Sequence, residues 1–186
     1  MTELVFCLEE ESAKAMLEGV LPRLLPNSDF VYRFIIFQGK QDLEKQLPRK
    51  LRAYRNSDAR FVVLRDQDSH PSCIAVKEKI LELCIQAGKP NSLIRIACKE
   101  LESFYLADLS AVELGLGLVG LSKLQLTKKF RNPDYLGSPS KELSMLTKGR
   151  YQKVGGSRSI GPYLQLDNTR SDSFRNLLSG IRRFAT

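Results

Sequence analysis

The chain has 186 residues, of which 42% are hydrophobic and 27% charged, enough apolar side chain for one ordinary core and too much for a disordered chain. No apolar run approaches the roughly 20 residues that cross a bilayer, so we expect no membrane span. The start MTELVFCLEEE lacks the basic residues of a secretory signal, and a cytoplasmic protein is the expectation. The four cysteines are scattered and there is one histidine, which argues against a clustered zinc site.

The net charge of +8 arises wholly in the last third of the chain. Residues 1–119 carry 16 Lys or Arg and 17 Asp or Glu, whereas residues 120–186 carry 13 and four. Such a basic segment attracts phosphate groups, or it forms a solvated surface that keeps the protein soluble, and the charge leaves both open. We therefore divide the chain into a predicted core, residues 1–119, and a basic loop and helical extension, residues 120–186, packed on that core.

Four short apolar runs alternate with four amphipathic segments in the predicted core. The runs have the composition of buried strands, and the segments between them place apolar residues on one helical face. The expected strands are residues 4–8, 30–37, 61–64 and 93–97, and the expected helices are about residues 13–24, 43–54, 72–87 and 99–115. Pro48 falls inside the second helical pattern, so that helix begins there or is kinked there. The alternation predicts a Rossmann-like α/β fold with a four-stranded, mainly parallel sheet covered on both faces.

The C-terminal extension is less regular. Residues 131–162 contain repeated Gly, Pro and Ser, and we expect an ordered loop there. Backbone at Gly155 and Gly156 can approach a phosphate closely while nearby basic groups supply charge, with a flexible surface loop as the alternative. Residues 171–184 then predict a final basic helix with an inward apolar stripe. The predicted nucleic-acid-binding residues are Arg150, Lys153, Arg158 and Arg170.

Acidic side chains follow the first and third predicted strands. Glu9 and Glu10 come directly after the first strand, and Asp66 and Asp68 come after the third. Because ligands of a parallel sheet gather where strands end, these carboxylates reach one edge if the two strands are neighbours. Hard divalent cations prefer carboxylate oxygens, so the pattern predicts Mg²⁺ or Mn²⁺ held by Glu9, Asp66 and Asp68. A turn or a helix N-cap is the alternative for the Asp-x-Asp pair.

Two further glutamates follow the fourth predicted strand. Glu100 and Glu102 are two residues apart, roughly 200° around a helix, so both should not face one ion. We expect Glu102 to enter the site, with a surface or capping role as its alternative. Glu10 and Glu102 are therefore additional catalytic candidates, as metal ligands or as a base that orients water.

The segments LVFCLEEES and FVVLRDQDS resemble the TOPRIM domain of topoisomerases, bacterial primases and overcoming-lysogenization-defect nucleases, over about residues 1–110. The family's glutamate maps to Glu9 and its Asp-x-Asp to Asp66 and Asp68, while Glu10 stands where a small glycine is usual. A closer resemblance is to small bacterial TOPRIM-like proteins often encoded beside an AAA-type ATPase in phage-defence or abortive-infection loci. LEEESAKAMLEGVLPRLLP, LRDQDSHPSC, IACKELESFYLADLSAVE and GSRSIGPYL carry it over nearly the whole chain.

The resemblance implies a metal-dependent nuclease, or a nuclease-like effector, that works with an ATPase partner in anti-phage defence. With one histidine the chain offers no serine or cysteine triad, so metal-assisted cleavage of DNA or RNA is the first hypothesis. The second hypothesis is a non-catalytic adaptor that docks on an ATPase or on nucleic acid. The third is another phosphotransfer enzyme, such as a nucleotidyltransferase or a phosphatase. The sequence leaves the substrate, the need for a partner and the oligomeric state open.

Overall fold

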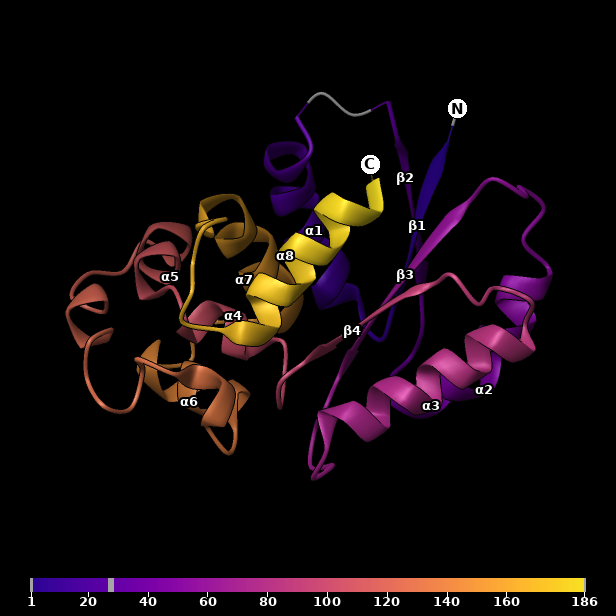
Figure 1. The fold of residues 1–186 in the computed structure, drawn as a ribbon. Helices are drawn as coiled ribbons and strands as arrows, with labels where there is room; N and C mark the ends of the chain where they lie inside the picture. Colours follow the sequence, from indigo (N-terminus) through magenta and orange to yellow (C-terminus); the bar gives the residue numbers. More distant parts are fainter. Residues whose placement is uncertain (1, 27–28, 186) are drawn as a thin grey trace.

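The computed structural model describes residues 2–26 and 29–185 (Figure 1). Within these residues one sheet is formed by β1 (Glu3–Leu8), β2 (Val31–Ile36), β3 (Arg60–Asp66) and β4 (Leu93–Ala97). The strand order is β2-β1-β3-β4, and every neighbouring pair is parallel. The predicted Rossmann-like α/β fold is confirmed, and the sheet is parallel throughout.

Helices cover both faces of this sheet (Figure 1). Helix α1 (Glu11–Leu24) lies on one face, and α2 (Lys40–Arg52) and α3 (Cys73–Gln86) lie on the other. After β4 the chain forms α4 (Glu102–Leu106), α5 (Leu109–Leu116), α6 (Pro139–Leu146), α7 (Lys153–Ile160) and α8 (Asp172–Ala185), with 3₁₀ turns at Ser122–Leu124, Pro133–Tyr135 and Gly161–Tyr163. None of the described helices is both long enough and apolar enough to span a membrane.

Alternate side chains of each strand enter two separate cores, because successive residues of a strand face opposite sides of a sheet. From β1, Phe6 and Leu8 join the core beneath α1, whereas Val5 and Cys7 join the core beneath α2 and α3. This two-sided burial explains why the strands read as continuous apolar runs in the sequence.

The segment after residue 120 shares the first of these cores. Helix α7 packs on α1, and the 3₁₀ turn after it approaches α1 at very short range, since a Cβ on Gly161 would lie 2.7 Å from the carbonyl oxygen of Met16. Helix α8 lies along β4, and its inward stripe is buried as predicted. The buried stripe consists of Phe174, Leu177, Leu178 and Ile181. The C-terminal segment therefore packs at the same layer as α1 (Figure 1).

Two predictions about local structure need correction, and one of the two alternatives for Pro48 is excluded. Residues 131–162 contain helices α6 and α7 in place of the expected loop, because short amphipathic segments are hard to recognise among Gly, Pro and Ser. The predicted helix at 99–115 is divided, since the Asp108 carboxylate accepts the backbone N–H of Ala111 at 3.1 Å and caps α5. Helix α2 begins at Lys40, before Pro48, which lies inside it.

Candidate functional site

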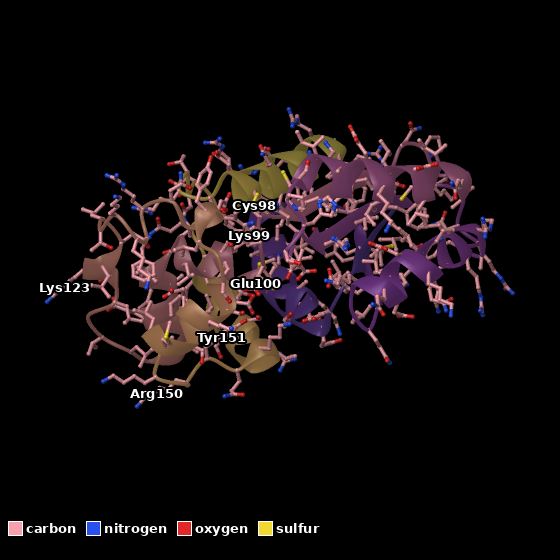
Figure 2. All side chains as sticks on the ribbon, turned by 90° about the horizontal axis from the view of Figure 1, so that it is seen from below. Cys98, Lys99, Glu100, Lys123, Arg150 and Tyr151 are labelled. Atoms are coloured by element: carbon pink, nitrogen blue, oxygen red, sulfur yellow. The ribbon has the colours of Figure 1, made fainter. Side chains whose placement is uncertain are left out.

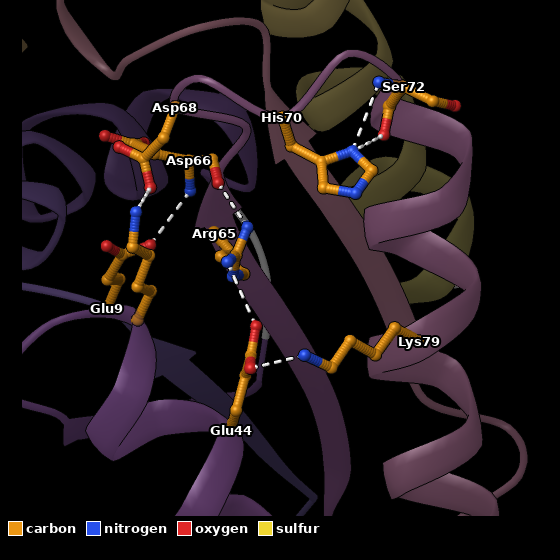
Figure 3. A network of polar contacts seen from close by, with 9 residues as sticks. Glu9, Glu44, Arg65, Asp66, Asp68, His70, Ser72 and Lys79 are labelled. Carbon is orange, nitrogen blue, oxygen red and sulfur yellow. Dashed lines mark hydrogen bonds and ion pairs between the residues drawn. The ribbon is translucent and has the colours of Figure 1, made fainter.

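Two carboxylates lie at the ends of the neighbouring strands β1 and β3. Strand β1 pairs with both β2 and β3, so its carboxyl end is where the strand order reverses, the usual ligand position in such sheets. The Glu9 Oε2 atom accepts a hydrogen bond from the backbone N–H of Asp66 at 3.1 Å (Figure 3). The backbone carbonyl of Glu9 accepts the N–H of Gly39 at 3.0 Å, and only glycine adopts the φ of 91° there without strain. These contacts fix both carboxylates at one edge.

The loop after β3 is held in a strained conformation. Asp68 has a φ of 55° and Lys99, after β4, has a φ of 63°, a left-handed region that costs non-glycine residues about 1–3 kcal/mol each. The Asp68 N–H donates to the Lys99 carbonyl at 2.6 Å, and the Lys99 N–H donates to Gln67 Oε1 at 3.2 Å. Gln67 is buried and donates from its Nε2 to the His70 carbonyl at 2.7 Å. The surrounding contacts thus hold Asp68 in place despite the strain.

Glu102 reaches this edge from the first turn of α4 and is only 1% exposed. The Tyr151 hydroxyl donates a hydrogen bond to Glu102 Oε1 at 2.9 Å. Glu100 has a different role, because its Oε2 accepts the backbone N–H of Ser140 at 2.7 Å and supports the start of α6. Figure 2, which looks onto the carboxyl ends of the strands, shows Glu100 and Tyr151 at this junction of core and C-terminal segment.

Burial raises the pKa of three carboxyls at this edge. The pKa of Asp66 lies well above its ordinary value, because burial disfavours its charge and because Glu9 and Glu102 are close. Burial also raises the pKa of Glu9, although the N–H of Asp66 opposes this rise, and the charge of Asp68 adds to it. Burial raises the pKa of Glu102 too, while its hydrogen bond from Tyr151 works in the other direction. Such carboxyls gain from any cation placed among them.

Two lysines supply positive charge at the same edge. The Lys40 Nζ atom lies 3.2 Å from Asp68 Oδ2, and Lys153 is paired with Glu10. Burial by itself would lower the pKa of Lys153, but the contact with Glu10 and the other carboxylates of the site raise it above its ordinary value. The ammonium of Lys153 therefore stays charged and faces the carboxylates.

The four basic residues predicted to bind nucleic acid lie in different surroundings. Lys153, the first residue of α7, belongs to the carboxylate site. Arg150 and Arg158 are exposed, and Figure 2 shows Arg150 pointing outward from the rim of the C-terminal segment. Arg170 is half-buried, with its Nη1 atom 3.5 Å from the carbonyl oxygen of Ala107. Arg150, Lys153 and Arg158 are thus exposed, whereas Arg170 is not.

The predicted glycine loop is wrong, because Gly155 and Gly156 lie inside α7. A Cβ on Gly156 would lie 2.4 Å from Cδ2 of Tyr151, whereas a Cβ on Gly155 would meet nothing within 4 Å. Gly156 therefore leaves room for the Tyr151 ring, which in turn holds Glu102.

Three parts of the site were not predicted from the sequence: Lys40, Tyr151, and the hydrogen bonds by which Gln67 holds the loop after β3. Lys40 directly follows the loop after β2. The rule that ligands gather where parallel strands end therefore also predicts Lys40 near the site. Tyr151 gave no comparable signal, since its partner Glu102 is 49 positions away and the contact exists only in the folded chain.

The side chains at this edge are of the chemical type that binds a hard divalent cation. Glu9, Asp66, Asp68 and Glu102 offer carboxylate oxygens, the ligands that Mg²⁺ and Mn²⁺ prefer. Burial raises the pKa of Glu9, Asp66 and Glu102, and a nearby cation would favour their ionised forms. In the part of the chain that is described, no three acidic, histidine or cysteine side chains are already gathered as a metal-binding group. Glu9 instead holds the Asp66 N–H, and Asp68 holds Lys40.

Fold and site together define an α/β protein with a carboxylate-rich site at the switch point of a parallel sheet. The chain belongs to the family described as a domain of unknown function, DUF4276, whose model matches residues 8–182. No curated protein and no solved structure matches the chain. The family match begins at the last residue of β1 and ends within α8, so it includes every residue of the site.

Proposed function

We propose that the protein is a nuclease that uses Mg²⁺ or Mn²⁺ to cleave phosphodiester bonds in DNA or RNA. The observation that carries this proposal is the gathering of Glu9, Asp66 and Glu102 at one edge, where burial raises their pKa values and the first and last raise that of Asp66 further. Such a cluster destabilises a metal-free protein, and a divalent cation offsets the repulsion. The position at the strand switch point also favours a ligand site.

In this proposal Glu9, Asp66 and Asp68 provide the oxygens that hold the cation. The bound ion supplies Lewis-acid chemistry for phosphodiester hydrolysis. Glu102 is positioned by Tyr151, and its raised pKa suits it to accept and hold a proton during the reaction.

Lys153 is the residue proposed to contact the substrate phosphate. It now pairs with the exposed Glu10 carboxylate and can exchange that partner for a phosphate oxygen. A hollow of about 430 Å³ beside Glu10 and Lys153, with Gly39 on its wall, gives a strand room at this point. Exposed Arg150 and Arg158 extend the positive surface, and the absence of a base-reading motif in the sequence favours recognition of the backbone.

The test compares cleavage of plasmid DNA, single-stranded DNA and tRNA in Mg²⁺, Mn²⁺ or EDTA. We expect metal-dependent cleavage that falls more than about a hundredfold in Asp66→Ala/Asp68→Ala, since residues that merely orient metal ligands are worth about 10–100-fold. Asp58→Asn, an exposed acid before β3, is the matched control and should cleave normally. Equal cleavage by all three proteins, or cleavage that persists in EDTA, contradicts the proposal.

A second candidate function is a non-catalytic adaptor. The observation in its favour is that three apolar side chains within 13 residues are exposed: Leu114 is 61% exposed, Val119 91% and Leu126 81%. A partner that covers them would bury this apolar area, and the sequence resemblance suggests an AAA-type ATPase as the partner in cytoplasmic anti-phage defence. An adaptor would bind its partner equally well with and without the two aspartates, whereas a partner-activated nuclease would require them for cleavage.

A further inference from the structure

A second polar hollow lies on the face of β3 opposite to Asp66, toward α2 and α3. It measures about 360 Å³ and lies between the first turns of α2 and α3. Asp68 lines it, so it adjoins the proposed metal site directly. Its charged and titratable lining consists of Lys40, Glu44, Arg65, Asp68, His70 and Lys79.

Arg65 is the buried charge of this hollow. It is only 6% exposed, because residues next to each other in a strand face opposite sides and Arg65 points toward α2 and α3. Its Nη1 atom donates to the Asp66 carbonyl at 2.7 Å, and its Nη2 atom lies 3.0 Å from Glu44 Oε1 (Figure 3). The buried Nε atom has no hydrogen-bond partner within residues 2–26 and 29–185. A buried guanidinium with an unused donor is costly without a further anion.

The carboxylate of Glu44 serves two cations at once. Besides Arg65 it binds the Lys79 Nζ atom at 2.6 Å, so one negative charge is shared between two positive charges (Figure 3). Lys40 adds a third positive charge, and its partner Asp68 is one of the proposed metal ligands. The ring of His70 lies beside this group (Figure 3). The hollow therefore has positive charge to spare, next to a site that has excess negative charge.

We propose that this hollow binds a phosphate group of the nucleic-acid strand, one that neighbours the bond presented to the carboxylates. The proposal rests on the proposed nuclease function and adds a second binding point for the same strand. The planar fork of Arg65 suits phosphate oxygens, and Lys79 supplies a point charge. A hollow of about 360 Å³ falls in the size range of small-ligand sites and can hold a phosphate with its sugar.

The test uses metal-free protein in EDTA, which separates this binding from cleavage. The side-chain N–H signal of Arg65 Nε is followed by NMR, because the burial of that group protects its proton from exchange. The probes are a thymidine trinucleotide, which contains phosphodiesters, and inorganic phosphate, both at matched ionic strength. Lys79→Gln removes one cation from the hollow, and Lys77→Gln removes an exposed lysine of α3 that does not line it.

We expect saturable shifts of the Arg65 signal with the trinucleotide, and about tenfold weaker binding in Lys79→Gln, since hydrogen bonds to charged groups are worth about 1.5–3 kcal/mol. Lys77→Gln should bind as the unchanged protein does. The proposal is overturned if the Arg65 signal does not move, if both variants weaken binding equally, or if inorganic phosphate binds and the trinucleotide does not. Binding of the trinucleotide without any cleavage in Mg²⁺ or Mn²⁺ supports the hollow and contradicts the nuclease.

Discussion

Two adjacent residues of β3, Arg65 and Asp66, face opposite sides of the sheet and meet opposite electrostatic surroundings. On the Asp66 side, carboxylates lie together and their pKa values are raised. On the Arg65 side, one carboxylate is shared between two cations. The alternation of side chains along a strand thus separates an acidic side from a basic side within one residue. The acidic side lacks positive charge, and the basic side lacks negative charge. A metal ion on the acidic side and a phosphate of a nucleic-acid strand on the basic side would balance both.

The basic side depends most on Glu44. In Glu44→Ala the buried Arg65 loses its salt bridge with Glu44, and we expect a loss of about 2–3 kcal/mol in stability, less than for a fully buried pair because Glu44 is partly exposed. At about 2–4 °C per kcal/mol, thermal unfolding detects this change. Inorganic phosphate should restore part of the lost stability in this variant. Glu78→Ala, an exposed acid on α3, serves as the control, and an equal loss in both variants would contradict the comparison.

The acidic side, unlike the basic side, depends on the C-terminal segment through Gly156. Gly156→Ala forces a Cβ to within 2.4 Å of the Tyr151 ring and should destabilise the protein by about 1–3 kcal/mol. Gly155→Ala has open space and should stabilise α7 by about 0.5–1 kcal/mol, since alanine is the better helix former. Thermal unfolding of the pair therefore gives shifts of opposite sign. Two shifts of the same sign would show that Tyr151 is not held as described.

Tyr151→Phe removes the hydroxyl that holds Glu102 and leaves the ring in place. We expect cleavage to fall about tenfold, and its pH dependence to move to higher pH. The sign follows because the hydrogen bond stabilises the ionised carboxylate, so its loss raises the pKa of Glu102 further. A uniform loss of activity at every pH would assign Tyr151 a merely structural role.

Asp66→Asn is the change on the acidic side with the smallest expected effect, a shift in thermal stability. The raised pKa of Asp66 means that the folded protein binds a proton more readily than the unfolded chain, so ionisation of Asp66 destabilises the metal-free fold. The penalty is absent below the unfolded pKa of about 3.9 and grows as the pH rises through the folded value. In EDTA near neutral pH the variant should therefore melt higher than the unchanged protein, by a few degrees. Near pH 4 the two should melt together, and a variant that melts lower at neutral pH would contradict the account.

The strands and the first carboxylates could be predicted from the sequence because both depend on local pattern. Buried parallel strands are continuous apolar runs, and a carboxylate at the end of such a run lies at the ligand edge of the sheet whatever else the chain does. Glu9, Asp66 and Asp68 follow from that rule. Helical geometry predicted that Glu100 and Glu102 would face apart, and they do have different partners, although α4 begins only at Glu102 and Glu100 precedes it.

The rest of the site could not be predicted, because it depends on contacts between distant segments. Tyr151 reaches Glu102 only after α7 packs on α1, and the two glycines of α7 lower its helix propensity and made it look like a loop. Nothing in the sequence indicates that Lys99 adopts a left-handed backbone conformation, which lysine normally avoids. Nothing in the sequence distinguishes Arg65 from a residue of a surface salt bridge, and only its burial in the folded chain does so.

The central claim, that this edge binds a divalent cation, is tested most directly by calorimetric titration of Mn²⁺ into the metal-free protein near neutral pH. We expect saturable binding of Mn²⁺ that is lost in Asp66→Asn and retained in Asp58→Asn. Binding that is unchanged in Asp66→Asn, or no saturable binding to the unchanged protein, would contradict it.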